Sequence, residues 1–227
     1  MRQTCLTNGR ASNRDGRTDT IRKATPNDLP DIIAIHQRAF TDFFLTRLGL
    51  DFLRTYYGLV LHYHSGIVLV GERQSAVQGF ACGFVDPAEF YRMMWQTKWN
   101  FALPVLSALI RQPSLVTRVL SGVQRVVRTP ASERPPRSCE LSSIAVAPES
   151  SGNGFGKALI RGFLEHAWSM DARCVYLTTD ADENDAANTF YRDAGFQQTR
   201  RFLQHKGRWM NEYVVDGLEA SANCETH

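Results

Sequence analysis

The segment Gly152–Lys157 (GNGFGK) constrains the fold most, because it lies between a strand-like apolar stretch and a helix-like amphipathic stretch. A strand, a glycine turn and a helix in this order leave the first N–H groups of the helix unpaired. With the helix dipole, these groups form an anion site suited to phosphate. A P-loop would need glycine at Ser151 and Ser or Thr at Ala158, and the dinucleotide fingerprint would need glycine at Lys157. Neither common nucleotide motif fits, and the segment alone is equally compatible with a purely structural turn.

The composition limits the classes of protein that this chain can belong to. Its 227 residues are 43% hydrophobic and 22% charged, so one globular domain is expected. Twenty-six Lys and Arg against 23 Asp and Glu leave a charge of +3, which is too small to indicate a nucleic-acid partner. Five scattered cysteines form no C-x-x-C pair, so we expect no disulfide framework, no thiolate metal site and a reducing, cytoplasmic setting. No window approaches the roughly 18 uncharged residues of a membrane span.

The chain divides into two tails and one domain. We expect residues 1–19 to be a disordered polar tail that lacks the apolar run of a secretory signal, and residues 218–227 to be a polar C-terminal tail. In the domain between them, residues 20–217, the apolar pattern predicts strands and helices. The expected strands are 21–24, 66–71, 76–85, 139–146, 173–179, 196–204 and 209–215, and the expected helices begin at residues 26, 48, 155 and 184. A strand–helix–strand order over residues 139–179 requires a right-handed parallel crossover, so we predict an α+β fold with a mixed sheet.

Residues 87–137 interrupt the sheet and read as a helical insertion that ends in a proline-rich linker. They carry no acidic residue from position 90 to 127, while Arg111, Arg118 and Arg125 recur every seven residues. These arginines would share one helical stripe if the helix continued past Pro113. We therefore expect an insertion beside the acceptor entrance that contacts phosphate, a partner or a membrane surface. An apolar lid with solvated arginines explains the pattern equally well.

Two sequence blocks resemble the GNAT family of acyl-CoA-dependent N-acetyltransferases. Ile144–Leu159 is similar to the pyrophosphate-binding block of that family, Q/R-x-x-G-x-G/A, and Asn184–Phe196 (N-x-x-A-x-x-F-Y-x-x-x-G-F) is similar to its second signature. The resemblance is specific over Cys139–Val215 and weaker over Ile21–Val85. It implies a mostly antiparallel sheet that is flanked by helices and splayed after the fourth strand. It also implies acetyl-CoA as co-substrate. The histidines lack the spacing of a metal site, so we expect no metal.

By this resemblance, backbone groups of the strand end and the glycine turn hold the coenzyme. Ser151 stands where the family usually has Arg or Gln, from which we expect weaker but not abolished coenzyme binding. Asn184 would bond the pantetheine arm through its amide, and capping of the following helix is a second use for it. The residues implied for coenzyme binding are Ile144, Ala145, Val146, Ser151, Gly152, Asn153, Gly154, Phe155, Gly156, Lys157, Asn184 and Tyr191.

Acetyl transfer to an amine requires a neutral amine, a donor to the developing oxyanion and a proton for the leaving thiolate. The resemblance implies Glu140 as general base, the N–H of Val146 as oxyanion donor and Tyr191 as general acid. A phenol of ordinary pKa, about 10, is protonated at neutral pH and can donate to a thiolate whose conjugate acid titrates near 8.5. A surface carboxylate for Glu140 and a core aromatic for Tyr191 are the structural alternatives.

The acceptor side is less well defined by the sequence. The resemblance implies walls from the first helix–loop–helix and the last hairpin, with substrate contacts from Asp42, Phe43, Phe44 and Glu140, although aromatic residues there also fit a core. Three functions remain open: an N-acetyltransferase for a small-molecule amine such as an amino sugar or its nucleotide derivative, a protein or peptide amine acetyltransferase, and a non-catalytic acyl-CoA-binding module. We expect a small-molecule acceptor and a monomer or homodimer.

Overall fold

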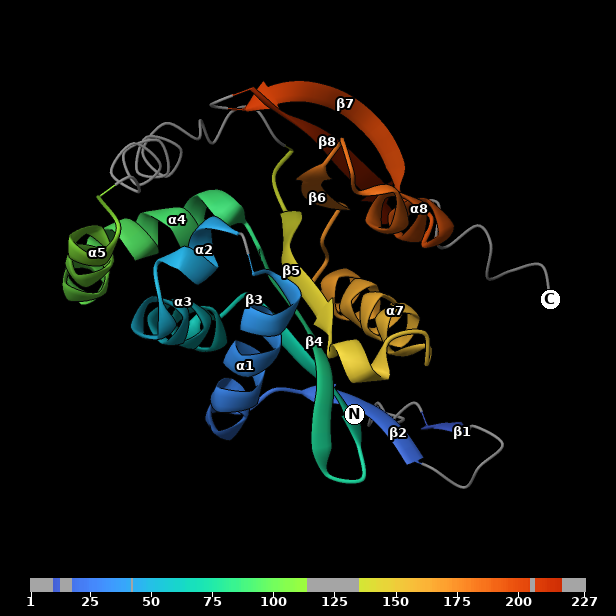
Figure 1. Cartoon of the computed structure of the whole chain (residues 1–227). Coiled ribbons are helices and arrows are strands. Elements are labelled where there is room, and N and C mark those ends of the chain that lie inside the picture. The colour runs from blue at the N-terminus through green and yellow to red at the C-terminus, as the bar shows by residue number, and fades with distance from the viewer. Residues whose placement is uncertain (1–9, 13–17, 42, 114–134, 205–206, 218–227) are drawn as a thin grey trace, which may run out of the picture.

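The computed structural model describes residues 10–12, 18–41, 43–113, 135–204 and 207–217. In these residues an eight-stranded sheet runs through the molecule in the order β1-β2-β3-β4-β5-β6-β8-β7 (Figure 1). All neighbouring strands are antiparallel except β5 and β6, which are parallel, so the predicted mixed sheet is confirmed. The strands are β1 (Arg10–Ser12), β2 (Thr18–Lys23), β3 (Gly66–Arg73), β4 (Ala76–Val85), β5 (Ser138–Val146), β6 (Cys174–Asp180), β7 (Gln197–Gln204) and β8 (Arg208–Asp216).

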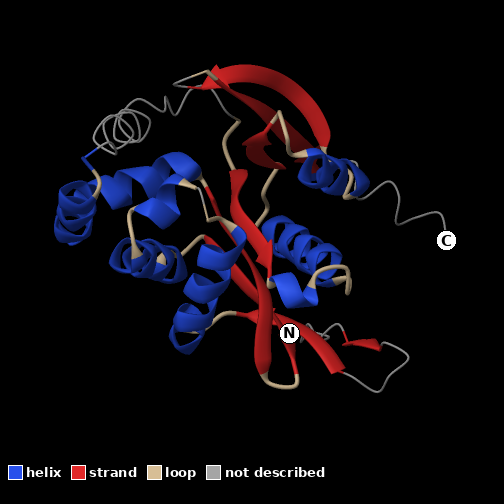
Figure 2. Ribbon diagram, in the orientation of Figure 1, coloured by secondary structure: helices blue, strands red, loops and turns tan. Residues whose placement is uncertain are grey.

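Helices cover both faces of this sheet (Figure 2). On one face, α1 (Leu29–Ala39) and α3 (Leu50–His62) pack against β3 and β4. The short helix α2 (Phe44–Arg47) lies in the aromatic connector between them. The helices of the insertion, α4 (Pro87–Gln96) and α5 (Trp99–Arg111), extend the same layer outward from the sheet (Figure 1).

On the opposite face, α7 (Phe155–Ser169) packs against β3, β4 and β5, and α8 (Asp185–Asp193) contacts β7. The predicted inward face of α7 is confirmed, because Leu159, Phe163 and Ala167 recur every four residues and are each 0% exposed. Burial of a large apolar side chain contributes about 1.5–3 kcal/mol, which fixes the face that α7 turns to the sheet. The sheet thus separates two apolar cores, one beneath α7 and one beneath α1 and α3.

The sheet splays between β5 and β6. These strands pair only over Ser138–Glu140 and Cys174–Tyr176. Beyond Glu140, β5 is paired with β4 alone, while β6 continues beside β8 as far as Asp180. Figure 1 shows β6, β8 and β7 turning away from β5 as a separate wing. The expected splay follows β5, the fourth strand counted from β2, and leaves one edge of residues 141–146 open to a gap.

A β-bulge interrupts β5 where it pairs with β4. Ser143 lies opposite Cys82 and Leu141 lies opposite Gly83, so Ser142 is an extra residue on β5. A bulge shifts the alternation of side chains, and here Ser142 and Ser143 both turn toward α3. Their partners there are the consecutive tyrosines Tyr56 and Tyr57. The alternation of side chains along β5 therefore reverses at the bulge, directly beside the splay.

The expectation of a disordered tail over residues 1–19 is wrong in part, because Arg10–Ser12 forms β1 and β2 begins at Thr18. An edge strand such as β2 presents unpaired backbone groups, to which a preceding segment can add another strand. The remainder of that tail and residues 218–227 lie outside the described residues.

Arg111 is the one member of the expected arginine stripe that lies in the described residues. The helix α5 ends at Arg111, and Pro113 disfavours a helical conformation at the residue before it. Arg118 and Arg125 lie outside the described residues.

None of the helices described here is both long and apolar enough to cross a membrane. The three cysteines that the described ranges contain, Cys82, Cys139 and Cys174, are buried free thiols.

Candidate active site

The predicted anion site lies beyond β5, where a 3₁₀ turn (Pro148–Ser150) leads to the glycine turn and α7 begins at Phe155. Gly152 and Gly154 have φ angles of +78° and +85°, a region that residues with a Cβ rarely adopt. Among the described residues, no atom lies within 4 Å of the place where a Cβ would stand on either glycine. The turn therefore exposes its backbone at the positive end of α7, as a phosphate ligand requires.

Side chains contribute little to this anion site. The Phe155 ring is buried beneath β3, where it packs on Gly71 and lies 4.8 Å below the Arg73 guanidinium carbon. Its backbone N–H alone remains available to a ligand. The polar residues of the turn are exposed to solvent: Ser151, Asn153 and Lys157. Serine at position 151 thus removes the family's usual cationic or amide side chain but leaves the backbone donors in place.

The open edge of β5 presents main-chain groups to the gap. The N–H of Ala147 donates to the carbonyl oxygen of Gln78 in β4 at 2.7 Å. Because main-chain groups alternate along a strand, the N–H and C=O groups of Val146 and Ile144 point the other way, into the gap. Ala145 has its side chain buried toward α1 and α3. An amide-containing arm such as pantetheine can pair with this edge as an added strand would.

The first turn of α7, the end of β5 and α8 meet at Gly156. A Cβ on this glycine would stand 3.3 Å from the Phe190 ring and 3.9 Å from the Val146 side chain. Tyr191 follows Phe190, and its ring centroid lies 5.9 Å from that of Tyr213. Burial raises the pKa of Tyr191 to about 12. The phenol therefore keeps its proton throughout the neutral pH range, which a proton donor to a thiolate must do.

Two asparagines anchor α8 to the end of β6. Asn184 donates through Nδ2 to Thr179 Oγ1 at 2.8 Å and to the Asp180 carbonyl at 3.2 Å. It occupies the N-cap position of α8 without capping the helix through its side chain. The buried Asn188 donates to the same Asp180 carbonyl at 3.0 Å and accepts a hydrogen bond from Tyr213 at 2.9 Å. This network fixes α8 beside the gap.

Glu140 is the last residue of β5 that pairs with β6, and two tyrosines hold its carboxylate. Tyr91 of α4 donates to Oε1 at 2.9 Å, and Tyr176, the register partner in β6, donates to Oε2 at 2.7 Å. A carboxylate offers about four lone-pair positions, so two remain for an ammonium or a water molecule. The carboxylate is half-buried, and bonds from two separate elements orient it. The alternative of a surface ion pair does not describe it.

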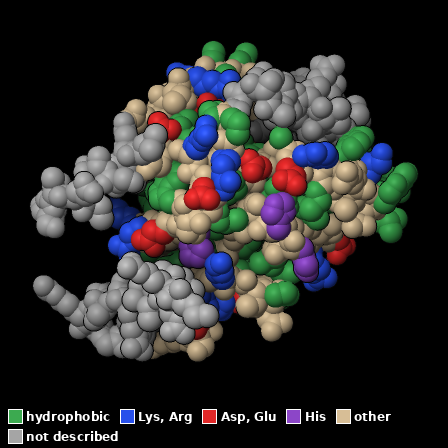
Figure 3. Space-filling model, turned by 180° about the vertical axis from the view of Figure 1, so that it is seen from behind, with side chains coloured by type: hydrophobic (Ala, Val, Ile, Leu, Met, Phe, Trp, Pro, Cys, Tyr) green, Lys and Arg blue, Asp and Glu red, His purple; other side chains and the backbone are tan. Residues whose placement is uncertain are grey.

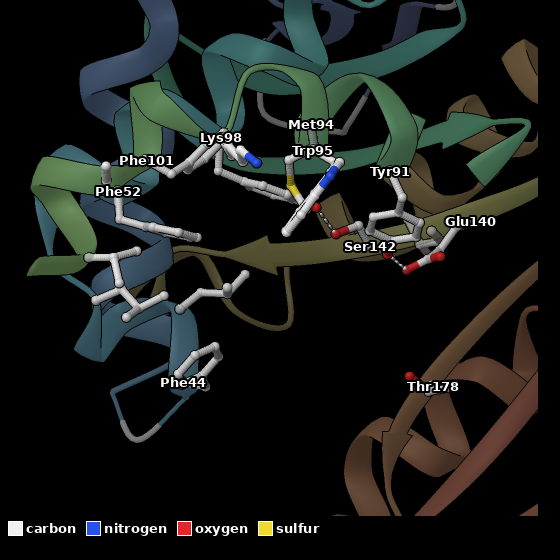
Figure 4. A pocket seen from close by; sticks show the side chains of 16 residues that line it. Phe44, Phe52, Tyr91, Met94, Trp95, Lys98, Phe101, Glu140, Ser142 and Thr178 are labelled. Carbon is white, nitrogen blue, oxygen red and sulfur yellow. Dashed lines mark hydrogen bonds between the residues drawn. The ribbon is translucent and has the colours of Figure 1, made fainter. Parts of the chain in front are cut away.

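A pocket of about 490 Å³ adjoins Glu140 (Figure 4). Residues of α2 and α3 form one wall, residues of α4 and α5 form the other, and β5 lies at the base. Figure 4 shows Tyr91 and Glu140 at one end and Phe52 and Phe101 toward the other. Ser142 lies between these ends, with its Oγ 2.5 Å from the Tyr56 hydroxyl, so it shares the face of Glu140 as predicted. The pocket joins a carboxylate at the splay to an apolar interior.

The expected acceptor residues divide between this pocket and its surroundings. Phe44 lines the pocket. Phe43 lies outside the pocket lining: the residue is 41% exposed, and its ring centroid lies 5.2 Å from the Arg208 guanidinium carbon. The reason is that α2 begins at Phe44, so neighbouring residues at the helix start project in different directions. Asp42 lies outside the described residues.

Sequence reasoning missed both partners of Glu140 and most of the pocket lining. Tyr176 carried a usable signal, because parallel pairing of β5 with β6 brings it beside Glu140. Tyr91 carried none, since it lies in an insertion without a recognisable motif. No group of His, Cys, Asp or Glu within the described part of the chain is arranged to hold a metal ion.

Comparisons with known proteins agree with this arrangement. Residues 29–196, which include both sequence blocks, match the Acetyltransferase (GNAT) family. The chain is 37% identical over 90 residues to N-alpha-acetyltransferase RimI of Mycobacterium tuberculosis, a match that covers 38% of this chain and 51% of that protein. The chain thus matches about half the length of this curated relative.

Two solved structures share the fold. An N-acetyltransferase from Staphylococcus aureus Mu50 has a TM-score of 0.57 at 17% identity, over 87% of this chain and 98% of the other. Ribosomal-protein-alanine N-acetyltransferase from Brucella melitensis has a TM-score of 0.57 at 20% identity, over 86% of this chain and 98% of the other. With the splayed sheet, the glycine turn at α7 and the family match over most of its length, this chain belongs to the GNAT family of acetyltransferases.

Proposed function

We propose that this chain is an N-acetyltransferase that moves an acetyl group from acetyl-CoA to a primary amine by direct attack of the amine on the thioester. The observation that carries this proposal is the gap beside β5. The glycine turn before α7 lies at one end of the open strand edge, and Glu140 lies at the other. A coenzyme and an acceptor that enter from opposite ends would meet along this edge.

Acetyl-CoA supplies the acetyl group in activated form, as a thioester. The residues of this chain suit such a co-substrate, because Gly152 and Gly154 leave room for close approach of a pyrophosphate to the backbone. Main-chain groups of Ile144 and Val146 remain for the pantetheine arm, and the amide of Asn184 lies at the start of α8.

In the proposed mechanism, Glu140 takes a proton from the acceptor ammonium, directly or through water, so that the nitrogen can form the new C–N bond. The N–H of Val146 donates a hydrogen bond to the carbonyl oxygen as it becomes negative. Tyr191 gives its proton to the sulfur as the C–S bond breaks, and it regains a proton from the new amide nitrogen. One proton leaves to solvent through Glu140, so the exchange balances.

The acceptor is proposed to be a small molecule. A pocket of about 490 Å³ lies within the roughly 300–1,000 Å³ that ligand pockets of proteins occupy. A protein N-terminus is the second candidate, because the matched relative is an N-alpha-acetyltransferase. An acceptor peptide would need a route past α4 and α5, which wall the pocket.

A thiol-release assay with acetyl-CoA tests the proposed function. The purified chain is offered separate pools of small amines and of peptides with free N-termini, and amide products are identified by mass spectrometry. We expect thiol release that depends on an amine, with a matching acetylated product. Tight coenzyme binding without amine-dependent release from any pool would instead indicate a non-catalytic acyl-CoA-binding module.

A further inference from the structure

We propose that the acceptor is a primary amine carried on an apolar body, aliphatic or aromatic, which fills the pocket and places its ammonium at Glu140. This inference rests on the proposed acetyl transfer and names the chemical class of its acceptor. It differs from the amino sugar that the sequence suggested.

The first reason is the nature of the pocket wall. More than half of the side chains that line it are hydrocarbon or thioether groups, and most of these come from the helices α2, α3, α4 and α5. They include Leu48 and Phe52 from one wall and Met94, Phe101 and Val105 from the other. The rings of Phe52 and Phe101 lie 5.4 Å apart and close the end far from Glu140 (Figure 4). Such a wall stabilises a ligand by removing its apolar surface from water.

The second reason is that three hydroxyl groups at the base of the pocket already bond to other lining groups. The hydroxyls of Tyr56 and Ser142 lie 2.5 Å apart. The hydroxyl of Tyr91 donates to Glu140. An amino sugar in this space would bury several hydroxyl groups beside a mostly apolar wall, and each hydroxyl left unpaired costs free energy. An apolar body incurs no such cost.

The third reason is the separation of charge. Among the described lining residues, Glu140 carries the negative charge and Lys98 the positive charge. The Lys98 ammonium lies 4.5 Å from the Trp95 ring centroid, away from the carboxylate (Figure 4). A cationic amine is attracted to Glu140 and repelled by Lys98, so its nitrogen is directed toward the splay. The body of the acceptor then extends between α3 and α5.

Of the two roles that the composition of the insertion allowed, a basic surface and an apolar lid, its described helices favour the apolar one. Its described helices turn Met94, Phe101 and Val105 into the pocket, while Arg111, the one described member of the expected arginine stripe, is not on the lining. Trp99 and Leu103 remain exposed on the outer side of α5, at 77% and 76%. Hydrophobic side chains gather at that edge of the molecule in Figure 3. This outer face supplies control positions for tests of the inner one.

A homologous series of amines tests the proposal directly. Initial rates are measured with propylamine, butylamine, pentylamine and hexylamine, with phenethylamine, and with spermidine and glucosamine as polar amines. Because these alkylamines share nearly the same ammonium pKa, differences in kcat/KM report the apolar body. We expect kcat/KM to rise about fourfold with each added methylene until the pocket is filled. The two polar amines should react more slowly than hexylamine.

Two tryptophans of the insertion form a matched pair of variants. Trp95 lines the pocket at 41% exposure, whereas Trp99 is 77% exposed and does not line it. Replacement Trp95→Ala should lower kcat/KM for hexylamine roughly tenfold and flatten the dependence on chain length. Trp99→Ala should keep the wild-type dependence. Both variants should bind acetyl-CoA with the wild-type Kd, which shows that each still folds.

The outcomes separate this inference from the proposed function. Faster acetylation of spermidine, glucosamine or a peptide N-terminus than of hexylamine would overturn the apolar acceptor and leave the acetyltransferase intact. Equal losses in the Trp95 and Trp99 variants would overturn the pocket assignment. Acetyl-CoA binding without acetylation of any amine or peptide would overturn the proposed function itself.

Discussion

The two halves of the site are built in different ways. On the proposed coenzyme side, the expected ligand groups are mainly backbone N–H and C=O groups of one continuous stretch, from the open edge of β5 to the first turn of α7. On the acceptor side, the groups are side chains brought together from α2, α3, α4, α5 and two strands. A site built from backbone groups depends on local chain geometry, and glycines in the sequence indicate that geometry. A site built from side chains of several elements depends on packing, which the glycines do not indicate.

The strongest test of the comparison is the backbone of the turn. Gly154→Val should abolish measurable acetyl-CoA binding in calorimetry, because a β-branched residue cannot keep the φ of +85° and would obstruct the approach of phosphate. Gly207→Val is the matched control, since this glycine has a φ of +79° in the β7–β8 turn. It should show the strain cost without the loss of coenzyme. Equal coenzyme affinity in both variants would contradict binding of the coenzyme by the backbone of the turn.

Replacement of Tyr191 shows whether the coenzyme side also carries chemistry. Tyr191→Phe should lower the rate of acetyl transfer by roughly 10²-fold, because the ring packing remains and the proton is lost. The Kd for acetyl-CoA should change little. The measurement is kcat with saturating acceptor, together with calorimetric coenzyme affinity. Wild-type turnover in the variant would show that Tyr191 only packs and does not donate a proton.

Glu140 marks the junction of the two halves, and its test is a pH profile. Glu140→Gln should lower kcat/KM at neutral pH by roughly 10-fold or more. The defect should shrink as pH approaches about 10.4, where an alkylamine loses its proton unaided. Glu165→Gln, on the exposed side of α7, serves as the control. A defect of the same size at every pH would assign Glu140 an orienting role through Tyr91 and Tyr176.

The last prediction concerns the stability of the core beneath α1 and α3, on the acceptor side of the sheet. His36 is 2% exposed, and its Nδ1 lies 2.7 Å from the Tyr57 hydroxyl, while its Nε2 has no partner among the described residues. Burial lowers the pKa of His36 from 6.5 to about 4. Between pH 6.5 and about 4, His36 binds a proton in the unfolded chain but not in the folded chain. Stability from this group is therefore complete above pH 6.5 and is lost as pH falls to about 4.

That loss should reach at most about 3 kcal/mol of unfolding free energy. Urea unfolding of the wild type and of His36→Gln, at neutral pH and near the folded pKa, measures it. The glutamine variant should lose less stability over this interval, because its side chain does not titrate. Parallel losses in both proteins would show that carboxylates elsewhere dominate the acid limb.

The sequence by itself determined the parts of this protein that obey short-range rules. Repeats of Leu159, Phe163 and Ala167 specify the buried face of α7, and the glycines before it specify a turn that other residues disfavour. The strand–helix–strand order specifies the parallel pairing of β5 with β6. Each of these follows from steric limits on the backbone or from periodic burial within about one element.

Only the tertiary structure decided how the acceptor side is assembled. The bulge at Ser142 turns consecutive serines of β5 toward consecutive tyrosines of α3, and α4 brings Tyr91 to Glu140 across 49 positions of sequence. The same packing makes α4 and α5 of the insertion the apolar wall of a pocket, a choice that the composition had left open. Contacts over such separations depend on how whole layers pack against each other, and no local pattern in the chain encodes that choice.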